Sequence, residues 1–185
     1  MERRIRYLLG AEEGRVVLRQ AGVTLIELMI AIALLALLLF VGVESYRAWI
    51  QNTQVRTAAE AILNGLQLAR GEAVRRNDNV QIVLSGATGW TVSVASTGEA
   101  IQSRTDGEGS QNARFTVSPA GATTVTFNGL GRVVANMDGS PPISQVEVSS
   151  LALTDAETRK LQVRIGVGDI RMCDPQLSAP DPRAC

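Results

Sequence analysis

An uninterrupted apolar run dominates the hydrophobic pattern of this chain. It extends from Gly22 to Val43 and contains one charged residue, Glu27, near its start. About 20 apolar residues are enough to cross the ~30 Å hydrocarbon core of a bilayer as an α-helix. The run therefore predicts a transmembrane helix over residues 23–43.

Beyond this run the apolar residues change to a helical spacing. They recur at steps of three and four residues, which places them on one face of a helix. The members of this face are Val55, Ala58, Ala59, Ile62, Leu66, Ala69 and Ala73. The first proline is Pro119, so nothing forces a break between Thr24 and Asn77. We expect residues 44–77 to form an amphipathic helix that continues the apolar one and stops at Asn77-Asp78-Asn79.

After residue 79 the pattern changes to short stretches rich in β-branched residues. Such stretches, separated by Gly, Pro, Asn and Ser clusters, predict strands. The expected strands are residues 80–84, 90–95, 114–117, 123–127, 132–135, 145–149, 160–165 and 169–172. Residues 85–89 are expected to form a hairpin loop, and residues 96–113 a longer loop. The predicted fold class is α+β, a long N-terminal helix packed on a small antiparallel β-sheet domain over residues 78–185.

Charge is distributed unevenly on the two sides of the apolar run. Residues 1–22 hold five arginines and three glutamates, a net charge of +2, and the remainder carries −2. Basic residues before a membrane span tend to stay in the cytoplasm, so the body of the protein is expected across the inner membrane. A slightly acidic body has no overall electrostatic footprint for nucleic acid, and contact with DNA would need a local basic patch.

The composition narrows the chemistry that the chain can perform. There is no histidine, which excludes histidine-based triads and histidine metal ligands. The two cysteines, Cys173 and Cys185, are too few for a closed zinc site. No nucleophile elbow is present, so we expect no catalytic residue, metal site or cofactor. In an extracytoplasmic domain the two cysteines favour a disulfide, with two free thiols as the alternative.

The two ends of the apolar run differ as processing sites. An ordinary secretory signal has a shorter apolar stretch and a small-residue cleavage site after it, which Glu44-Ser45-Tyr46-Arg47 does not offer. At the other end Gly22 is followed by Val-Thr-Leu-Ile-Glu, so Glu27 is the fifth residue after the glycine. This arrangement resembles the class III signal of type IV pilins and type II secretion pseudopilins.

The resemblance implies roles for three residues. In that family the prepilin peptidase cuts after the glycine on the cytoplasmic side, and the new N-terminus is methylated. Gly22 would thus end a leader peptide of residues 1–22, and Val23 would become the methylated N-terminus, where Phe or Met is more usual. Glu27 would neutralise a neighbouring N-terminus and set the subunit register in a filament. The alternative is a lone carboxylate, costly within lipid, that reaches the interface or is recognised only by the peptidase.

Two further segments resemble the GspH/FimT branch of this family. Leu66–Asn77 resembles its helix-ending signature, and Thr126–Val133 its strand-turn-strand segment. The resemblance implies a low-abundance, FimU-like minor pilin that helps prime or cap a filament, or a GspH-type minor pseudopilin of type II secretion. The implied partners are the prepilin peptidase, other pilins or pseudopilins, an inner-membrane assembly platform, and membrane lipid before assembly. The segment Gly168–Pro175, with the closing Cys185, favours the pilus.

A third hypothesis is a DNA-binding pilin that acts in DNA uptake. Some FimT-type pilins contact DNA through a Gly-Arg-x-Arg motif, and the aligned stretch here is Gly168-Asp169-Ile170-Arg171. Arg171 matches the motif, but Asp169 replaces an arginine, which is unfavourable beside a phosphate. Arg164 and Arg183 are the residues that would compensate. DNA binding is the least favoured of the three hypotheses.

Overall fold

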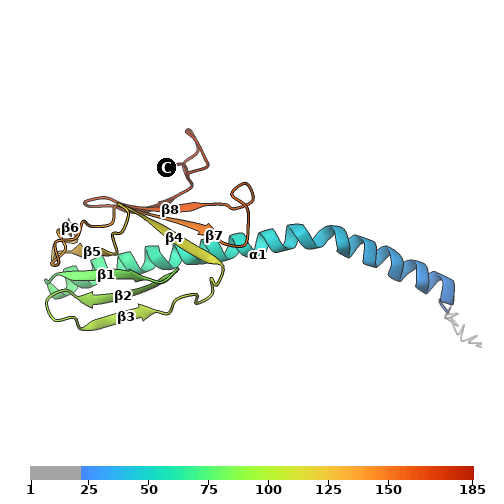
Figure 1. Cartoon of the computed structure of the whole chain (residues 1–185), viewed down its shortest axis with the longest axis horizontal. Coiled ribbons are helices and arrows are strands. Elements are labelled where there is room, and N and C mark those ends of the chain that lie inside the picture. Colours follow the sequence, from blue (N-terminus) through green and yellow to red (C-terminus); the bar gives the residue numbers. More distant parts are fainter. Residues whose placement is uncertain (1–21) are drawn as a thin grey trace, which may run out of the picture. The chain divides into compact units, whose positions relative to one another are not determined.

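The computed structural model of the chain describes residues 22–185 and divides them between two units. The first unit ends at Val41, and the second covers Gly42–Cys185. A single helix, α1 (Leu25–Arg76), passes through both units (Figure 1). The predicted leader falls outside the described residues except for Gly22.

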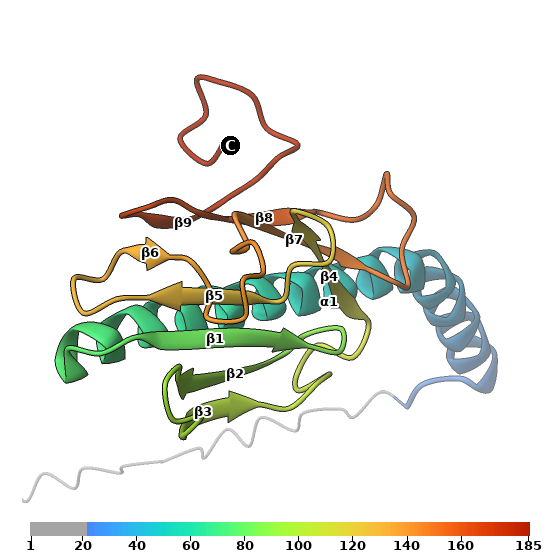
Figure 2. The same ribbon diagram turned by 60° about the vertical axis from the view of Figure 1, so that its left-hand side comes forward.

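Within the second unit, α1 buries one face in the hydrophobic core. The seven positions predicted from the spacing are all 0 or 1% exposed: Val55, Ala58, Ala59, Ile62, Leu66, Ala69 and Ala73. Figure 2 shows strands lying along this part of the helix. Four of the seven residues are alanines, whose small side chains let the strands approach closely. The predicted amphipathic face is therefore confirmed.

α1 ends through a backbone cap at the predicted place. Asn77 adopts a positive φ of 52°, a conformation that asparagine tolerates better than most residues. Its amide donates to the carbonyl of Val74 at 3.4 Å. The next amide, that of Asp78, donates to the carbonyl of Ala73 at 3.2 Å. These two bonds form a Schellman cap, in which a left-handed residue ends the helix.

Five strands form the first antiparallel sheet, in the order β3-β2-β1-β5-β6. Their bounds are β1 (Val80–Ser85), β2 (Gly89–Val94), β3 (Ala100–Arg104), β5 (Thr124–Phe127) and β6 (Val133–Val134). β1 and β2 make the predicted hairpin, with Val80 opposite Val94 and Ser85 opposite Gly89. The loop between them is shorter than predicted, because Ser85 and Gly89 already belong to the paired strands.

Four strands form the second antiparallel sheet, in the order β4-β7-β8-β9. Their bounds are β4 (Ala113–Ser118), β7 (Gln145–Ser150), β8 (Leu161–Ile165) and β9 (Ile170–Cys173). β7 and β8 pair antiparallel as expected, with Val146 opposite Val163. Both sheets contribute buried residues to the same core as α1.

The prediction of an unbroken loop over residues 96–113 is wrong, because β3 lies within it. Within residues 22–185, β3 is the outer strand of its sheet and pairs with β2 alone. Its side chains are exposed or half-buried, so the stretch Ala-Ile-Gln-Ser-Arg carries almost none of the apolar alternation that marks a strand in a sequence. Backbone pairing with β2, the packing of Ile101 on the core and the hydrogen bonds of Arg104 order this strand, and these leave little periodic signal in the sequence.

One carboxylate ties the loop after β3 to the β1–β2 turn. Asp106 accepts hydrogen bonds from the amides of Ala87 at 2.9 Å and Thr88 at 2.7 Å. The bond from the Thr88 amide is the main cause that holds the pKa of Asp106 below its usual range. The ionised side chain therefore joins two loops that are distant in sequence.

The two glycines of the buried half of α1 have different surroundings. A Cβ added to Gly65 would lie 2.9 Å from the Cδ1 atom of Ile82 and 3.0 Å from the Cε2 atom of Trp90. A Cβ added to Gly71 would meet no atom within 4 Å. Gly65 thus allows β1 and β2 to approach the helix, whereas Gly71 has no packing role.

We predict opposite effects for alanine at these two positions. Gly65→Ala overpacks the contact with the Trp90 ring and should lower the free energy of unfolding by about 1–3 kcal/mol. Gly71→Ala removes backbone freedom at an open position and should raise it by up to ~1 kcal/mol. Urea unfolding of a head fragment (residues 45–185) measures both changes. Equal shifts for the two variants would contradict the assigned contact.

Candidate functional site

The first unit exposes large apolar side chains along its whole described length. Thirteen of them are between 55% and 85% exposed: Val23, Leu25, Ile26, Leu28, Met29, Ile30, Ile32, Leu34, Leu35, Leu37, Leu38, Leu39 and Phe40. In the described chain no continuous helical stretch meets by itself the length and hydropathy expected of a membrane span. The two stretches of α1 on either side of a short break, Leu25–Phe40 and Ser45–Arg76, meet these criteria as a pair. Water-soluble monomers rarely expose an apolar patch larger than a few hundred Å². The exposed segment is therefore a surface for contact with other molecules.

A polar cap starts α1 at the beginning of this apolar segment. The amide of Glu27 donates to the Oγ1 atom of Thr24 at 3.2 Å, and the amide of Leu28 donates to the carbonyl of Thr24 at 3.1 Å. Thr24 is thus the N-cap residue, with Glu27 three positions later, the spacing of a capping box. The carboxylate in the first turn also complements the positive end of the helix dipole. Thr24 was missed from the sequence, although the pattern Thr-x-x-Glu could have identified it.

In the second unit, two polar side chains of α1 hold distant loops against the helix. Asn52 donates to the carbonyl of Glu157 at 3.1 Å and accepts from the amide of Arg159 at 2.7 Å. Gln54 accepts from the amide of Asn112 at 3.1 Å. These bonds fix the loop between β7 and β8, and the segment before β4, to the start of the head helix.

A groove of about 650 Å³ lies between this part of α1 and the β8–β9 strands. Its lining comes from α1, from the strands and from the C-terminal loop: Trp49, Asn52, Thr53, Arg56, Arg159, Leu161, Met172, Cys173, Asp174 and Arg183. Arg56 pairs with Glu60 at 2.7 Å, and Arg183 pairs with Asp181 at 2.9 Å, so both guanidinium groups are partly neutralised. The sequence did not predict this groove, because its walls come from segments more than a hundred residues apart.

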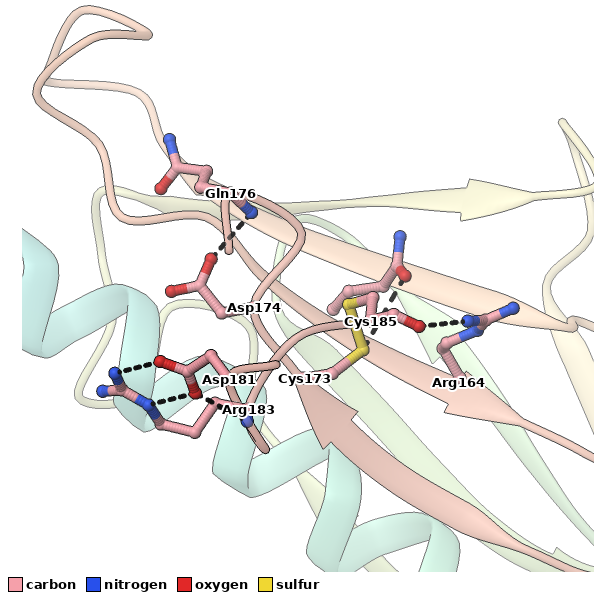
Figure 3. The surroundings of a disulfide bond; sticks show 8 residues. Arg164, Cys173, Asp174, Gln176, Asp181, Arg183 and Cys185 are labelled. Atoms are coloured by element: carbon pink, nitrogen blue, oxygen red, sulfur yellow. Dashed lines mark hydrogen bonds and ion pairs between the residues drawn. A yellow bond between two sulfur atoms is a disulfide. The ribbon is translucent and has the colours of Figure 1, made fainter. Parts of the chain in front are cut away.

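The C-terminal loop is closed by the predicted disulfide between Cys173 and Cys185, whose Cα atoms lie 5.1 Å apart. Figure 3 shows the bond at the end of β9, with the tail folded back over it. The amide of Asp174 donates to the carbonyl of Arg183 at 2.7 Å, and Arg164 donates to the carbonyl of Cys185 at 2.9 Å (Figure 3). The disulfide and these two bonds give a defined shape to a segment with little regular secondary structure.

An ion pair also stabilises this tail. The Nε and Nη2 atoms of Arg183 donate to the two carboxylate oxygens of Asp181 at 3.1 and 2.9 Å (Figure 3). The Arg183 guanidinium is the main cause that lowers the pKa of Asp181 to about 2. Because the pKa is lowered from 3.8, the pair stabilises the fold above pH 3.8 and loses this effect as the pH falls towards 2.

The three arginines considered for DNA contact do not share one surface. Arg164 on β8 and Arg171 on β9 are directly opposite each other. Both line a hollow of about 340 Å³ that also contains Asp169. Arg183 instead lines the larger groove and binds Asp181. The structure therefore brings two of the three together, beside a carboxylate.

The basic end of α1 is also partly neutralised. Glu72 accepts hydrogen bonds from Arg75 at 3.0 Å and from Arg76 at 3.0 Å. The bonds from Arg75 and then Arg76 are the main causes that lower the pKa of Glu72 to about 2. Arg76 also lies 3.6 Å from Glu99. These ion pairs support the expectation of a solvated helix end rather than a nucleic-acid contact.

The architecture is that of a pilin: a long helix packs in its head half on antiparallel strands, and its N-terminal half exposes apolar side chains. A crystal structure of the type IV minor pilin FimU of Pseudomonas aeruginosa strain PAO1 is similar, with a TM-score of 0.51 and 17% identity, and the match covers 71% of this chain and 97% of that chain. A second crystal form of FimU gives a TM-score of 0.48 with 17% identity, covering 68% and 97%. At 17% identity, the first of these two likenesses shows the fold.

Two family profiles identify the family of this chain. The profile described as Type II transport protein GspH matches residues 58–168, and the Prokaryotic N-terminal methylation motif matches residues 18–43. The first match covers more than half of the chain, which therefore belongs to the GspH family of pilin-like proteins. No curated protein matches the chain.

We predict that the disulfide contributes substantially to the stability of the head. A double variant, C173S with C185S, removes the crosslink without adding bulk. In the chain-entropy account, a loop of this size stabilises by roughly 3 kcal/mol. The urea midpoint of the head fragment (residues 45–185) should fall accordingly, and amide exchange should become fast in residues 174–184. The single variant C173S is the control and should lose as much stability, because either change breaks the bond. An unchanged midpoint would contradict the prediction.

Proposed function

We propose that this chain is a minor type IV pilin, a low-abundance subunit that helps prime or cap a filament anchored in the inner membrane. One observation carries the proposal: on a chain with the pilin fold, the exposed apolar surface Val23–Phe40 begins at the residue after Gly22, within the processing sequence Gly22–Glu27. The match to the N-terminal methylation motif supports processing at this place.

The proposal divides the chain into four segments. Residues 1–22 are a leader that the prepilin peptidase removes, and residues 23–43 are the helix that crosses the membrane and later enters the filament core. Residues 44–77 continue that helix into the head, and residues 78–185 form the β-rich head. Before assembly the protein crosses the inner membrane once, with the leader in the cytoplasm and the head in the periplasm.

The energetics of the apolar segment support a membrane-bound stage that is followed by burial in a filament core. Burying one large apolar side chain contributes about 1.5–3 kcal/mol relative to leaving it in water. The thirteen exposed side chains of the first unit therefore favour any environment that excludes water. Lipid provides that environment before assembly, and the packed helices of other pilins provide it afterwards. A transfer between the two, driven by an assembly platform, never exposes the segment to water.

Glu27 is the residue that we expect to direct assembly. Cleavage after Gly22 leaves an ammonium group on Val23, next to the N-cap residue Thr24. An unpaired ammonium in a filament core costs several kcal/mol, which an incoming carboxylate offsets. Glu27 is exposed in the structure, so the carboxylate is accessible to the N-terminus of a neighbouring subunit.

The alternative machine is the type II secretion system, with this chain as a GspH-type minor pseudopilin. The family profile carries the type II name. The C-terminal segment from Gly168 to Pro175, closed by the disulfide to Cys185, resembles pilus members more closely and favours the pilus. DNA uptake stays the least supported role, because Asp169 lies beside Arg171 and Arg183 is already paired with Asp181.

We predict cleavage between Gly22 and Val23 by a prepilin peptidase. Intact mass and N-terminal sequencing of the full chain, expressed with and without the peptidase, measure this. With the peptidase the mature protein should begin at methylated Val23, and without it at Met1. A matched variant, Gly22→Leu, should stay uncleaved in both hosts. A wild-type product that begins at Met1 in both hosts would refute the proposed processing.

We predict that the charge of Glu27 is needed for assembly and not for cleavage. Glu27→Gln and Glu27→Val should be processed normally, but their amount in sheared filaments, relative to the membrane pool, should fall at least about tenfold, the equivalent of ~1.4 kcal/mol. Thr24→Ala is the control, because it removes the helix cap and keeps the carboxylate, and it should be incorporated almost normally. Normal incorporation of Glu27→Gln would show that the charge is dispensable.

A further inference from the structure

An exposed aromatic pair lies on the first described turns of the second unit. The rings of Tyr46 and Trp49 stack with their centroids 5.9 Å apart and their planes at 26°. Tyr46 is 62% exposed and Trp49 is 64% exposed. The other tryptophan, Trp90, is 4% exposed and packs in the core. One tryptophan thus serves the fold, and the other presents its ring to the surroundings.

The pair lies where a bilayer would change from hydrocarbon to headgroups. Val43 ends the apolar run, and Trp49 follows it by six residues, which is about 9 Å of helix. The headgroup layer on each side of a bilayer is about 5–8 Å thick. If the apolar run ends with the hydrocarbon, Tyr46 falls within this layer and the Cα atom of Trp49 lies just beyond it. Helical side chains lean toward the N-terminus, so the ring of Trp49 points back toward the layer.

The chemistry of the pair also fits this layer. Tyrosine and tryptophan combine an apolar ring with one hydrogen-bond donor, and both are enriched at membrane interfaces for this reason. Arg47 lies between them in the sequence and adds a cation that attracts lipid phosphates. A purely apolar partner would leave this guanidinium and the two donors without acceptors, so the lipid headgroup layer is the occupant that matches all three side chains.

We propose that Tyr46, Arg47 and Trp49 form an interfacial anchor that binds the headgroup layer on the head side of the membrane. The anchor sets the depth at which the helix rests before assembly. This inference rests on the proposed membrane stage of the function and adds to it the surface of the head that contacts lipid. It also predicts that Trp49, which lines the large groove, contacts lipid until the subunit leaves the membrane.

Tryptophan fluorescence of the full chain tests the anchor. The protein is reconstituted into vesicles of phosphatidylethanolamine and phosphatidylglycerol that contain lipids brominated near the headgroup end or near the methyl end of the acyl chains. Wild-type protein and the variant W49F are compared, so that their difference reports Trp49 while Trp90 stays in place in both. We expect the headgroup-end bromines to quench the Trp49 emission by about half, and the methyl-end bromines to leave it nearly unchanged.

A matched control places a tryptophan elsewhere on the head. L130W in the W49F background puts the ring at a position that is 78% exposed, in the turn between β5 and β6. The adjacent Gly131 lies against Arg70 and Val74, near the far end of the helix, so this ring should not be quenched.

The outcomes separate this inference from the proposed function. Flotation of the vesicles first shows whether the protein is membrane-bound. Bound protein whose Trp49 is quenched by neither lipid, or more strongly by the methyl-end bromines, would overturn the anchor and leave the membrane stage intact. Protein that does not float with the vesicles would overturn both.

Discussion

The head depends on one contact, the burial of the alanine-rich face of α1 beneath two sheets. The core joins this face to residues of both sheets, including Ile82 and Val92 of the first and Val146 and Val163 of the second. Because four of the seven buried side chains are alanines and Gly65 has no side chain, the strands lie close to the helix backbone at these positions. The two sheets do not need to cover each other, since each has the helix to pack against. Removing the helix would therefore expose the inner faces of both.

The same helix also positions the surfaces that face outward. Asn52 fixes the loop before β8, and the groove beside it is completed by the loop that the disulfide closes. The loop itself has few apolar contacts, and its shape comes from a covalent bond, an ion pair and two backbone carbonyls. A surface built in this way can change its side chains without disturbing the core, because the core residues come from other segments.

The parts of the fold that the sequence predicts are those with a periodic burial pattern. The helix face from Val55 to Ala73 is buried at steps of three and four residues, and β1 and β7 alternate in burial. The same periods are visible in the sequence. β3 was missed because this edge strand is exposed or half-buried along its length and shows little apolar alternation. The groove was missed because no local pattern marks segments that meet only after folding. Thr24 could have been found, since the capping-box spacing is local and needs no tertiary contact.

Polar groups at both ends of the apolar run limit how α1 can be positioned in a membrane. At one, Thr24 and Glu27 supply hydrogen bonds and charge at the helix start, and at the other Tyr46 and Trp49 combine apolar rings with polar edges. The residues between them, 28–45, fall within the ~17–25 that cross a bilayer. In the proposed membrane stage, a shift along the membrane normal would move Glu27 deeper into hydrocarbon in one direction or lift the rings out of the interface in the other. Both ends of the run would therefore set the depth of the subunit. The Glu27 end is the one that proposed cleavage makes available, because it brings the new ammonium of Val23 to the same boundary.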